Sequence, residues 1–312
     1  MRVGVLLLTF GTADTAADVP AYLEHVRGGP VSPELITEFQ GRLERIGGSP
    51  LIRITHEQAA SLETMLNREV GEDAVYSVRA GMLHAPPFIR DVVAEVMEQP
   101  PDRLLGIVLS PQYGSLVMRR YVEALHKTET ELGLSHPIQV AGAWHLAPAL
   151  IEALAQQLLT ALQSLGPDEA ASAPVLFTAH SLPRTVADAE PGYIQQLQET
   201  AEAVAEAASL DQSRWQFVYQ SAGHTREEWL RPDLVDVFPE LSGQGHQSVV
   251  VAPVQFVADH LEVLYDIDVA AREQAAAAGL RLVRTQSLNT HPLFIEALAE
   301  VVRRETIIGT NP

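Results

Sequence analysis

The chain has 312 residues, of which 46% are hydrophobic and 20% are charged, as in ordinary globular proteins with a real core. Its net charge of −19 argues against nucleic-acid binding, because phosphate backbones are bound by basic surfaces. The absence of cysteine excludes disulfide bonds, cysteine nucleophiles, cysteine-bound zinc and cysteine-held iron–sulfur clusters. No stretch has the length of a membrane span or of a signal peptide, so we expect a cytoplasmic protein without integral membrane association.

The first strand is predicted at Val3–Leu8 and ends at Phe10-Gly11-Thr12, where Gly11 permits a tight turn close to a ligand. The second and third glycines of a dinucleotide-binding fingerprint do not follow. Three helical patterns come next, and they suggest a helical lip inserted over the strand ends: Ala16–Val26, Pro33–Ile46 and Thr55–Asn67.

Four arginines fall in this region of an otherwise acidic chain: Arg27, Arg42, Arg45 and Arg53. They have two interpretations. They pair with glutamates on the surfaces of these helices, or they bind carboxylates of a ligand, which arginine holds in bidentate fashion.

Strands and helices then alternate along the chain. The further strands are predicted at Ala74–Met82, Leu104–Leu109, Ile138–Ala143, Val175–Ala179, Gln216–Gln220, Ser248–Val254 and Arg281–Thr285. Pro167–Pro174 is expected to be a short flexible loop. Regular alternation of this kind predicts parallel sheets of the doubly wound α/β class.

About four strands precede Ala143 and about four follow it, so we expect two similar halves with a cleft between them. The N-terminal domain, with its helical lip, is assigned to residues 1–135. The C-terminal domain is assigned to residues 136–312, and its last helix is a candidate to pack back on the first domain.

The stretch Val249–Asp268 reads as a buried strand followed by a helix over Ala258–Asp268. Asp259, Glu262 and Asp266 recur at i, i+3 and i+7, so a regular helix would place three carboxylates on one face. This pattern fits a solvated stripe on an acidic protein. It also fits a ligand crevice, because such crevices lie where strands of α/β sheets end.

A histidine, His180, follows the predicted strand Val175–Ala179 and precedes Pro183. A histidine at the carboxyl end of a parallel strand faces the crevice of such folds, and its ordinary pKa of about 6.5 suits a base at neutral pH. A lone histidine is equally compatible with a structural role. Opposite a carboxylate such as Glu262, a neutral imidazole is suited to holding a divalent metal or to moving protons.

Five stretches in one order resemble the ferrochelatase family, and more narrowly its soluble bacterial branch that metallates coproporphyrin III. They are LLLTFGTA, RLERIGGSPL, FTAHSLP, YQSAGHTREEWLRPD and FVADHLEVLYDID. The resemblance covers essentially the whole chain. It implies an α/β protein of two Rossmann-like, doubly wound parallel-sheet domains that face each other across a porphyrin cleft, with no nucleotide bound.

The resemblance assigns residues of this chain to a site. His180 falls at the family's metal-site and proton-accepting histidine, and Glu262 falls at the opposing glutamate. Both are expected to be catalytic and to contact the metal. Asp266 and Asp259 are expected to form a wet relay for protons or metal.

The residues expected to bind the porphyrin substrate are Phe10, Arg27, Arg42, Ser49 and Tyr121. All but Phe10 fall where this branch anchors porphyrin propionates. Phe10 replaces a tyrosine that can face the iron in the product, so it would contact the macrocycle by packing only, and an axial ligand must come from elsewhere. A glutamate of some relatives is replaced by Ala270, so a second, outer metal site is not carried over to this chain.

The resemblance implies a lyase that inserts Fe²⁺ into coproporphyrin III to give coproheme in haem biosynthesis, with release of two protons. Fe²⁺ is a substrate, and no resident cofactor is expected. His180 is expected to be the base with Glu262 on the opposite side, or Glu262 the base with His180 as the iron ligand. We also expect a monomer that contacts the next haem-pathway enzyme transiently.

Other functions remain open at this point. The substrate could be protoporphyrin IX, or the chain could be a porphyrin or haem carrier without a catalytic step. A cobalt chelatase acting on sirohydrochlorin would share the fold but generally has several histidines at its metal site. A nucleotide-binding α/β enzyme is disfavoured because no glycine-rich phosphate loop is present.

Overall fold

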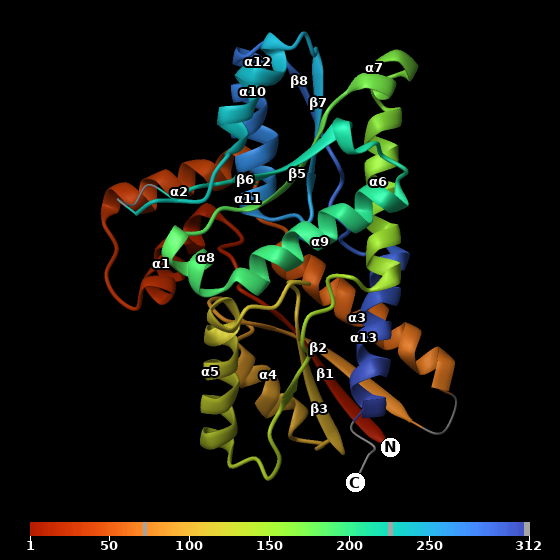
Figure 1. Cartoon of the computed structure of the whole chain (residues 1–312). Helices are drawn as coiled ribbons and strands as arrows, with labels where there is room; N and C mark the ends of the chain where they lie inside the picture. The colour runs from red at the N-terminus through yellow and green to blue at the C-terminus, as the bar shows by residue number, and fades with distance from the viewer. Residues whose placement is uncertain (71–73, 224–226, 309–312) are drawn as a thin grey trace. The chain divides into compact units, whose positions relative to one another are not determined.

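The computed structural model describes residues 1–70, 74–223 and 227–308 (Figure 1). Over these residues the chain forms two compact α/β units, each with its own four-stranded sheet. Unit 1 comprises Met1–Ala147, Ala258–His260 and Asn289–Pro312, and unit 2 comprises Pro148–Val257 and Leu261–Leu288. Both sheets are entirely parallel, which confirms the predicted fold class of two Rossmann-like α/β domains.

The sheet of unit 1 has the strand order β2-β1-β3-β4. Its strands are β1 (Arg2–Thr9), β2 (Val75–Met82), β3 (Arg103–Val108) and β4 (Gln139–Val140). Strand β1 lies between β2 and β3, and every residue after Arg2 is buried. The unbroken apolar run of β1 is therefore explained by coverage of both sheet faces.

The helices of unit 1 include the three expected after the first strand. They are the short 3₁₀ helix η1 (Ala16–Asp18), α1 (Val19–Arg27), α2 (Pro33–Ile46), α3 (Leu51–Val70), α4 (Ile89–Val96), α5 (Ser115–Leu132) and α13 (Pro292–Ile308). Helix α2 has the predicted bounds because its ends are encoded locally. Ser32 accepts a hydrogen bond from the Leu35 amide, Pro33 opens the helix, and Gly47 ends it at φ 74°.

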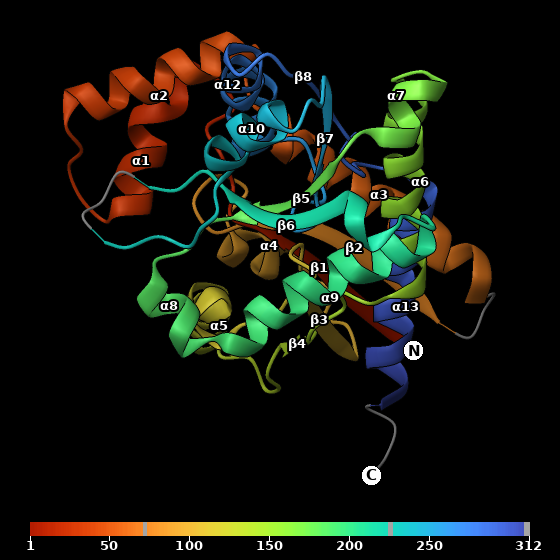
Figure 2. The same ribbon diagram turned by 45° about the horizontal axis from the view of Figure 1, so that its top comes forward.

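Helix α3 lies along β2, the edge strand of this sheet (Figure 2). The side-chain amide of Asn67 pairs with both backbone groups of Tyr76, at 2.9 and 2.8 Å. One turn earlier, Glu63 Oε2 accepts hydrogen bonds from the Val78 amide at 2.7 Å and from Arg79 Nη1 at 3.0 Å. Polar side chains of α3 thus satisfy backbone groups of β2 that no strand reaches.

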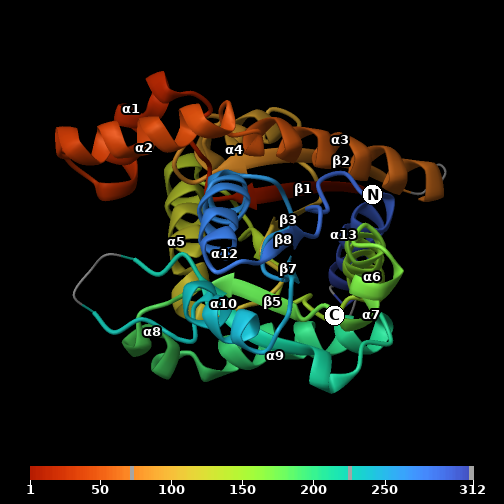
Figure 3. The same ribbon diagram turned by 90° about the horizontal axis from the view of Figure 1, so that it is seen from above.

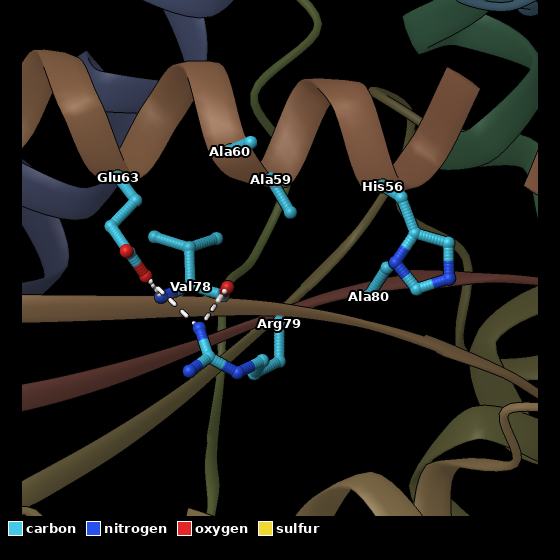
Figure 4. Close-up of a pocket in the computed structure, with 7 residues that line it drawn as sticks. All are labelled: His56, Ala59, Ala60, Glu63, Val78, Arg79 and Ala80. Atoms are coloured by element: carbon cyan, nitrogen blue, oxygen red, sulfur yellow. Dashed lines mark hydrogen bonds and ion pairs between the residues drawn. The ribbon is translucent and has the colours of Figure 1, made fainter. Parts of the chain in front are cut away.

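A shallow hollow of about 200 Å³ lies beside this contact, within unit 1 (Figure 4). Its walls include Glu63 and Arg79, and also His56 on α3 and Ala80 on β2. At this point α3 carries two short side chains, Ala59 and Ala60. The hollow is left open because neither is long enough to fill it.

The sheet of unit 2 has the strand order β6-β5-β7-β8, of which β5, β7 and β8 are labelled in Figure 3. Its strands are β5 (Val175–His180), β6 (Trp215–Gln220), β7 (Ser248–Pro253) and β8 (Arg281–Arg284). Its helices are α6 (Pro148–Gln163), α7 (Pro167–Ser172), α8 (Arg184–Ala189), α9 (Pro191–Ala207), the 3₁₀ helix η2 (Gln212–Arg214), α10 (Leu234–Gly243), α11 (Leu261–Leu264), the π-helix η3 (Asp266–Ala271) and α12 (Arg272–Ala277). Leu176, Val251 and Phe238 lie in its apolar core.

Four segments differ from the sequence-based expectation. Pro167–Ser172 is a helix and not a flexible loop, because Pro167 opens it and Asp168 and Glu169 stand in its first turn, where the helix dipole favours carboxylates. The strand expected at Ile138–Ala143 is reduced to Gln139–Val140. Helices α8 and α10 were not predicted.

The single helix expected at Ala258–Asp268 is also wrong. Regular α-helix is limited to Leu261–Leu264, and a π-helix follows over Asp266–Ala271. None of the described helices is both long enough and apolar enough to cross a membrane.

Two glycines in unit 1 give a matched test of the backbone. Gly11 has φ 84°, and a Cβ there would lie 3.0 Å from the Ala85 amide nitrogen. Gly41, in the interior of α2, has open space where a methyl side chain would stand. We expect Gly11→Ala to destabilise unit 1 by at least about 1 kcal/mol, and Gly41→Ala to stabilise it by about 0.5–1 kcal/mol.

Chemical denaturation monitored by circular dichroism measures both effects against wild type. Equal midpoints for the two variants would contradict the assigned role of Gly11.

Candidate functional site

The histidine singled out in the sequence, His180, is the last residue of β5. Its backbone amide donates to Gln255 Oε1 at 2.8 Å, and Gln255 Nε2 in turn donates to the Tyr193 hydroxyl at 2.6 Å. Tyr193 is fully buried in α9. The end of β5 is therefore held by a chain of hydrogen bonds that reaches the core of unit 2.

The ring of His180 is oriented by its own backbone. Nδ1 lies 2.6 Å from the carbonyl oxygen of Ser181. Because a carbonyl only accepts, this contact places the proton on Nδ1 and leaves the lone pair of a neutral ring on Nε2. Nε2 lies 4.0 Å from Glu262 Oε2. The two groups predicted to act together are thus brought together, with the basic nitrogen facing the carboxylate.

Glu262 stands in the first turn of α11. Its backbone carbonyl accepts a hydrogen bond from Gln220 Nε2 at 3.3 Å, and Gln220 Oε1 accepts one from the Thr178 hydroxyl at 2.6 Å. Gln220 and Thr178 are both buried, and they belong to β6 and β5. The glutamate side chain is 43% exposed and that of His180 is 27% exposed, so the pair is open to a ligand from solvent.

The π-helix beyond Glu262 carries two further carboxylates. Asp266 accepts a hydrogen bond from the Ser221 hydroxyl at 2.5 Å. Asp268 is bound by Arg284 of β8 through Nε at 2.9 Å and Nη2 at 2.8 Å. Arg284 is only 10% exposed, so this is a mostly buried bidentate ion pair that fixes the π-helix to the sheet.

Trp229 borders the histidine, with its ring centroid 6.4 Å from that of His180. A Cβ on Gly223 would lie 2.4 Å from this indole, so only glycine permits the close approach. Both residues belong to the stretch YQSAGHTREEWLRPD, of which residues 224–226, including His224, lie outside the described residues.

Asp259, expected on the same helical face, is not part of a helix. It precedes α11 and belongs to unit 1, whereas Glu262 and Asp266 belong to unit 2. Its backbone amide donates to Asn289 Oδ1, and Asn289 Nδ2 donates to Asp259 Oδ2, each at 2.9 Å. The i, i+3, i+7 pattern failed here because Asn289, thirty positions away, holds Asp259 outside the helix.

The residues expected to bind substrate all lie in unit 1: Phe10, Arg27, Arg42, Ser49 and Tyr121. Arg27 is the last residue of α1 and is exposed, whereas Arg42 pairs with Glu38 on the same helix at 2.5 Å. Ser49 is 6% exposed, and its hydroxyl has no hydrogen-bond partner among the described residues. Tyr121 is half-buried on α5.

Phe10 follows β1 and is 37% exposed. Its ring contacts His84, with centroids 4.4 Å apart, and His84 Nδ1 lies 2.9 Å from Nδ1 of His25. Burial lowers the pKa of His84 to about 4, with His25 and Arg120 contributing in the same direction. Phe10 therefore packs against an imidazole that is neutral at pH 7.

Two side chains of the site, His180 and Glu262, are candidates to bind a metal ion. Within residues 1–70, 74–223 and 227–308, no three histidine or carboxylate side chains gather as ligands of one metal ion. The pair His180 and Glu262 offers one nitrogen and one carboxylate, which suit a borderline divalent ion. With two protein ligands, such an ion would keep positions open for a second molecule to bind it.

Several supporting residues were missed in the sequence: Tyr193, Gln220, Ser221, Trp229 and Gln255. The signal that could have found Gln220 and Ser221 is their position at the end of β6, the same edge of the sheet at which His180 ends β5.

Comparison with known proteins supports the resemblance. A profile of the ferrochelatase family matches residues 2–306. The coproporphyrin III ferrochelatase of Geobacillus kaustophilus is 37% identical over 302 residues, covering 96% of this chain and 94% of the relative. The ferrochelatase of Deinococcus radiodurans is 36% identical over 307 residues, covering 97% of this chain and 96% of the relative.

Among solved structures, SirB from Bacillus subtilis with Fe³⁺ has a TM-score of 0.60 at 13% identity, covering 97% of this chain and 95% of that one. At that identity the likeness concerns the fold alone. The match of the family profile over nearly the whole length carries the assignment: the chain belongs to the ferrochelatase family and is a metal chelatase.

Proposed function

We propose that this chain inserts Fe²⁺ into coproporphyrin III to give coproheme in haem biosynthesis. The observation that carries the proposal is the Nε2 atom of His180, which faces Glu262 at 4.0 Å at the carboxyl end of the parallel sheet of unit 2. The choice of coproporphyrin is supported by the relatives of this name at 37% and 34% identity over nearly their full lengths.

The reaction replaces two pyrrole N–H protons with one metal ion. Nε2 of His180 is the proposed proton acceptor or iron contact, and both roles use the same lone pair, which the Nδ1–Ser181 contact leaves available. Glu262 takes the other of these two roles. Asp266, four residues further on, is the proposed relay that carries protons from the pair to water.

A flat porphyrin cannot hold two N–H protons and an approaching metal in one plane. We propose that binding energy from the periphery of the ring bends the macrocycle and exposes a pyrrole nitrogen to the base. Arg27, Arg42, Ser49 and Tyr121 are the proposed contacts for the propionates, with Phe10 packing on the ring.

Fe²⁺ and the porphyrin are the proposed partners, with no nucleic acid and no resident cofactor. We propose that the chain acts as a cytoplasmic monomer. The most direct test is spectrophotometric turnover with Fe²⁺ and either coproporphyrin III or protoporphyrin IX. We expect kcat/KM to be higher with coproporphyrin III, and a preference for protoporphyrin IX would contradict the proposed substrate.

His180→Ala should abolish insertion of Fe²⁺, because the imidazole that serves as base or iron contact opposite Glu262 is lost. Porphyrin affinity should stay within about tenfold of wild type, or roughly 1.4 kcal/mol. Turnover is followed by the absorbance of the metallated product, and affinity by fluorescence quenching of the free porphyrin. His126→Ala, which removes an exposed histidine of α5, is the control. Normal turnover in His180→Ala would refute the assigned role.

Arg27→Ala and Arg42→Ala should each weaken coproporphyrin III binding, because each removes a cation opposite a propionate. We expect a loss of about 5- to 30-fold in affinity, or roughly 1–2 kcal/mol. Arg53→Ala is a matched control, because Arg53 is 65% exposed and pairs with Glu57 in the same unit. Titration of porphyrin fluorescence measures all three. If Arg53→Ala weakens binding as much as the other two, the effect is one of net charge, and neither arginine is a specific contact.

A further inference from the structure

Ser221 has an unusual backbone conformation. It follows β6 directly and has φ 60°, in the left-handed region that residues other than glycine rarely adopt. Two other described non-glycine residues have positive φ, Ser209 at 53° and Asn289 at 45°. Ser209 lies just past the C-terminus of α9, where left-handed residues are common, and asparagine tolerates this region better than serine does. Neither explanation applies to Ser221.

The conformation of Ser221 coincides with a specific contact. Its hydroxyl donates to Asp266 Oδ2 at 2.5 Å, across 45 positions of sequence. The neighbouring Gln220 reaches the backbone carbonyl of Glu262 at 3.3 Å and the Ser221 hydroxyl oxygen at 3.5 Å. The end of β6 therefore contacts the segment that begins at Glu262 at two points, the Glu262 carbonyl and the Asp266 carboxylate, which are four residues apart.

The two aspartates of the π-helix are held in different ways. Asp268 is bound by a mostly buried arginine through two nitrogen atoms, which is a typical structural contact. Asp266 is contacted by a neutral hydroxyl on a strained residue, and it lies four residues after Glu262. Strain of this kind persists where the surrounding structure imposes it, most often at functional sites.

We propose that Ser221 is a positioning residue for metal insertion and that it acts by orienting the Asp266 carboxylate relative to Glu262. This inference rests on the proposed relay role of Asp266. The hydroxyl donates to the ionised carboxylate and restricts its rotation, so the carboxylate keeps one orientation while protons leave the His180–Glu262 pair. The left-handed backbone is the conformation in which the Ser221 hydroxyl makes this contact.

Two substitutions separate the hydroxyl from the strain. Ser221→Ala removes the hydroxyl and keeps the left-handed strain, whereas Ser221→Gly removes both. If Ser221 positions Asp266, both variants should lower kcat by a similar factor, roughly tenfold or more for loss of a hydrogen bond to a charged group. KM for the porphyrin should change by less than about threefold, because the ring does not contact Ser221 in this proposal.

Stability and kcat should then change independently of each other. Ser221→Gly should unfold at a denaturant concentration no lower than Ser221→Ala, although both have the same low kcat. A purely structural role predicts the opposite, with kcat recovering in the more stable variant. Ser209→Ala and Ser209→Gly are matched controls, because Ser209 is an exposed serine with nearly the same φ, and kcat should be unchanged in both.

A double-mutant cycle tests whether the effect passes through Asp266. In an Asp266→Ala background, Ser221→Ala should cause no further loss of kcat. Additive losses would show that Ser221 acts by another route and would overturn the proposal, as would wild-type kcat in Ser221→Ala.

The cycle is measured with whichever porphyrin the wild-type protein metallates fastest. Failure of coproporphyrin III as substrate would therefore contradict the proposed substrate without affecting the conclusion on Ser221. Wild-type kcat in Asp266→Ala would contradict the relay itself, and with it the role of Ser221.

Discussion

The proposed chemistry of this protein depends on one hydrogen bond, between Nδ1 of His180 and the carbonyl oxygen of Ser181. An imidazole that must accept a proton or contact a metal at neutral pH has to present an unprotonated nitrogen in a fixed direction. The backbone carbonyl assigns the proton to Nδ1, and the lone pair of Nε2 is then turned toward Glu262. A parallel strand that ends at this residue is what brings ring, carbonyl and carboxylate to one edge of the sheet.

This arrangement is supported by side-chain amides more than by charges. Gln255 joins the end of β5 to the buried Tyr193, and Gln220 joins Thr178 to the first turn of α11. Each amide donates and accepts at once, so each connects two elements without adding net charge to a strongly acidic protein. Because Tyr193, Gln220 and Thr178 are buried, loss of one member of these networks leaves a buried polar group without its partner.

The sequence was informative where structure is determined locally. The bounds of α2 follow from Ser32, Pro33 and Gly47, and the apolar run of β5 placed His180 at a strand end. It was misleading where distant residues decide. Arg284 of strand β8 binds the π-helix, and Asn289 binds Asp259 outside the helix. Neither contact could be inferred from helical periodicity. The strain at Ser221 leaves no mark in the sequence, because serine, unlike glycine or asparagine, does not indicate a left-handed backbone.

The pairing of Asn67 with Tyr76 has a consequence beyond the fold of one molecule. The amide offers one donor and one acceptor in the manner of a peptide group, so α3 occupies the place that another strand would take. A foreign chain that approached β2 would first have to displace Asn67 and Glu63 from their backbone partners. The open edge of the sheet is thereby protected against intermolecular strand pairing, which is a route to aggregation.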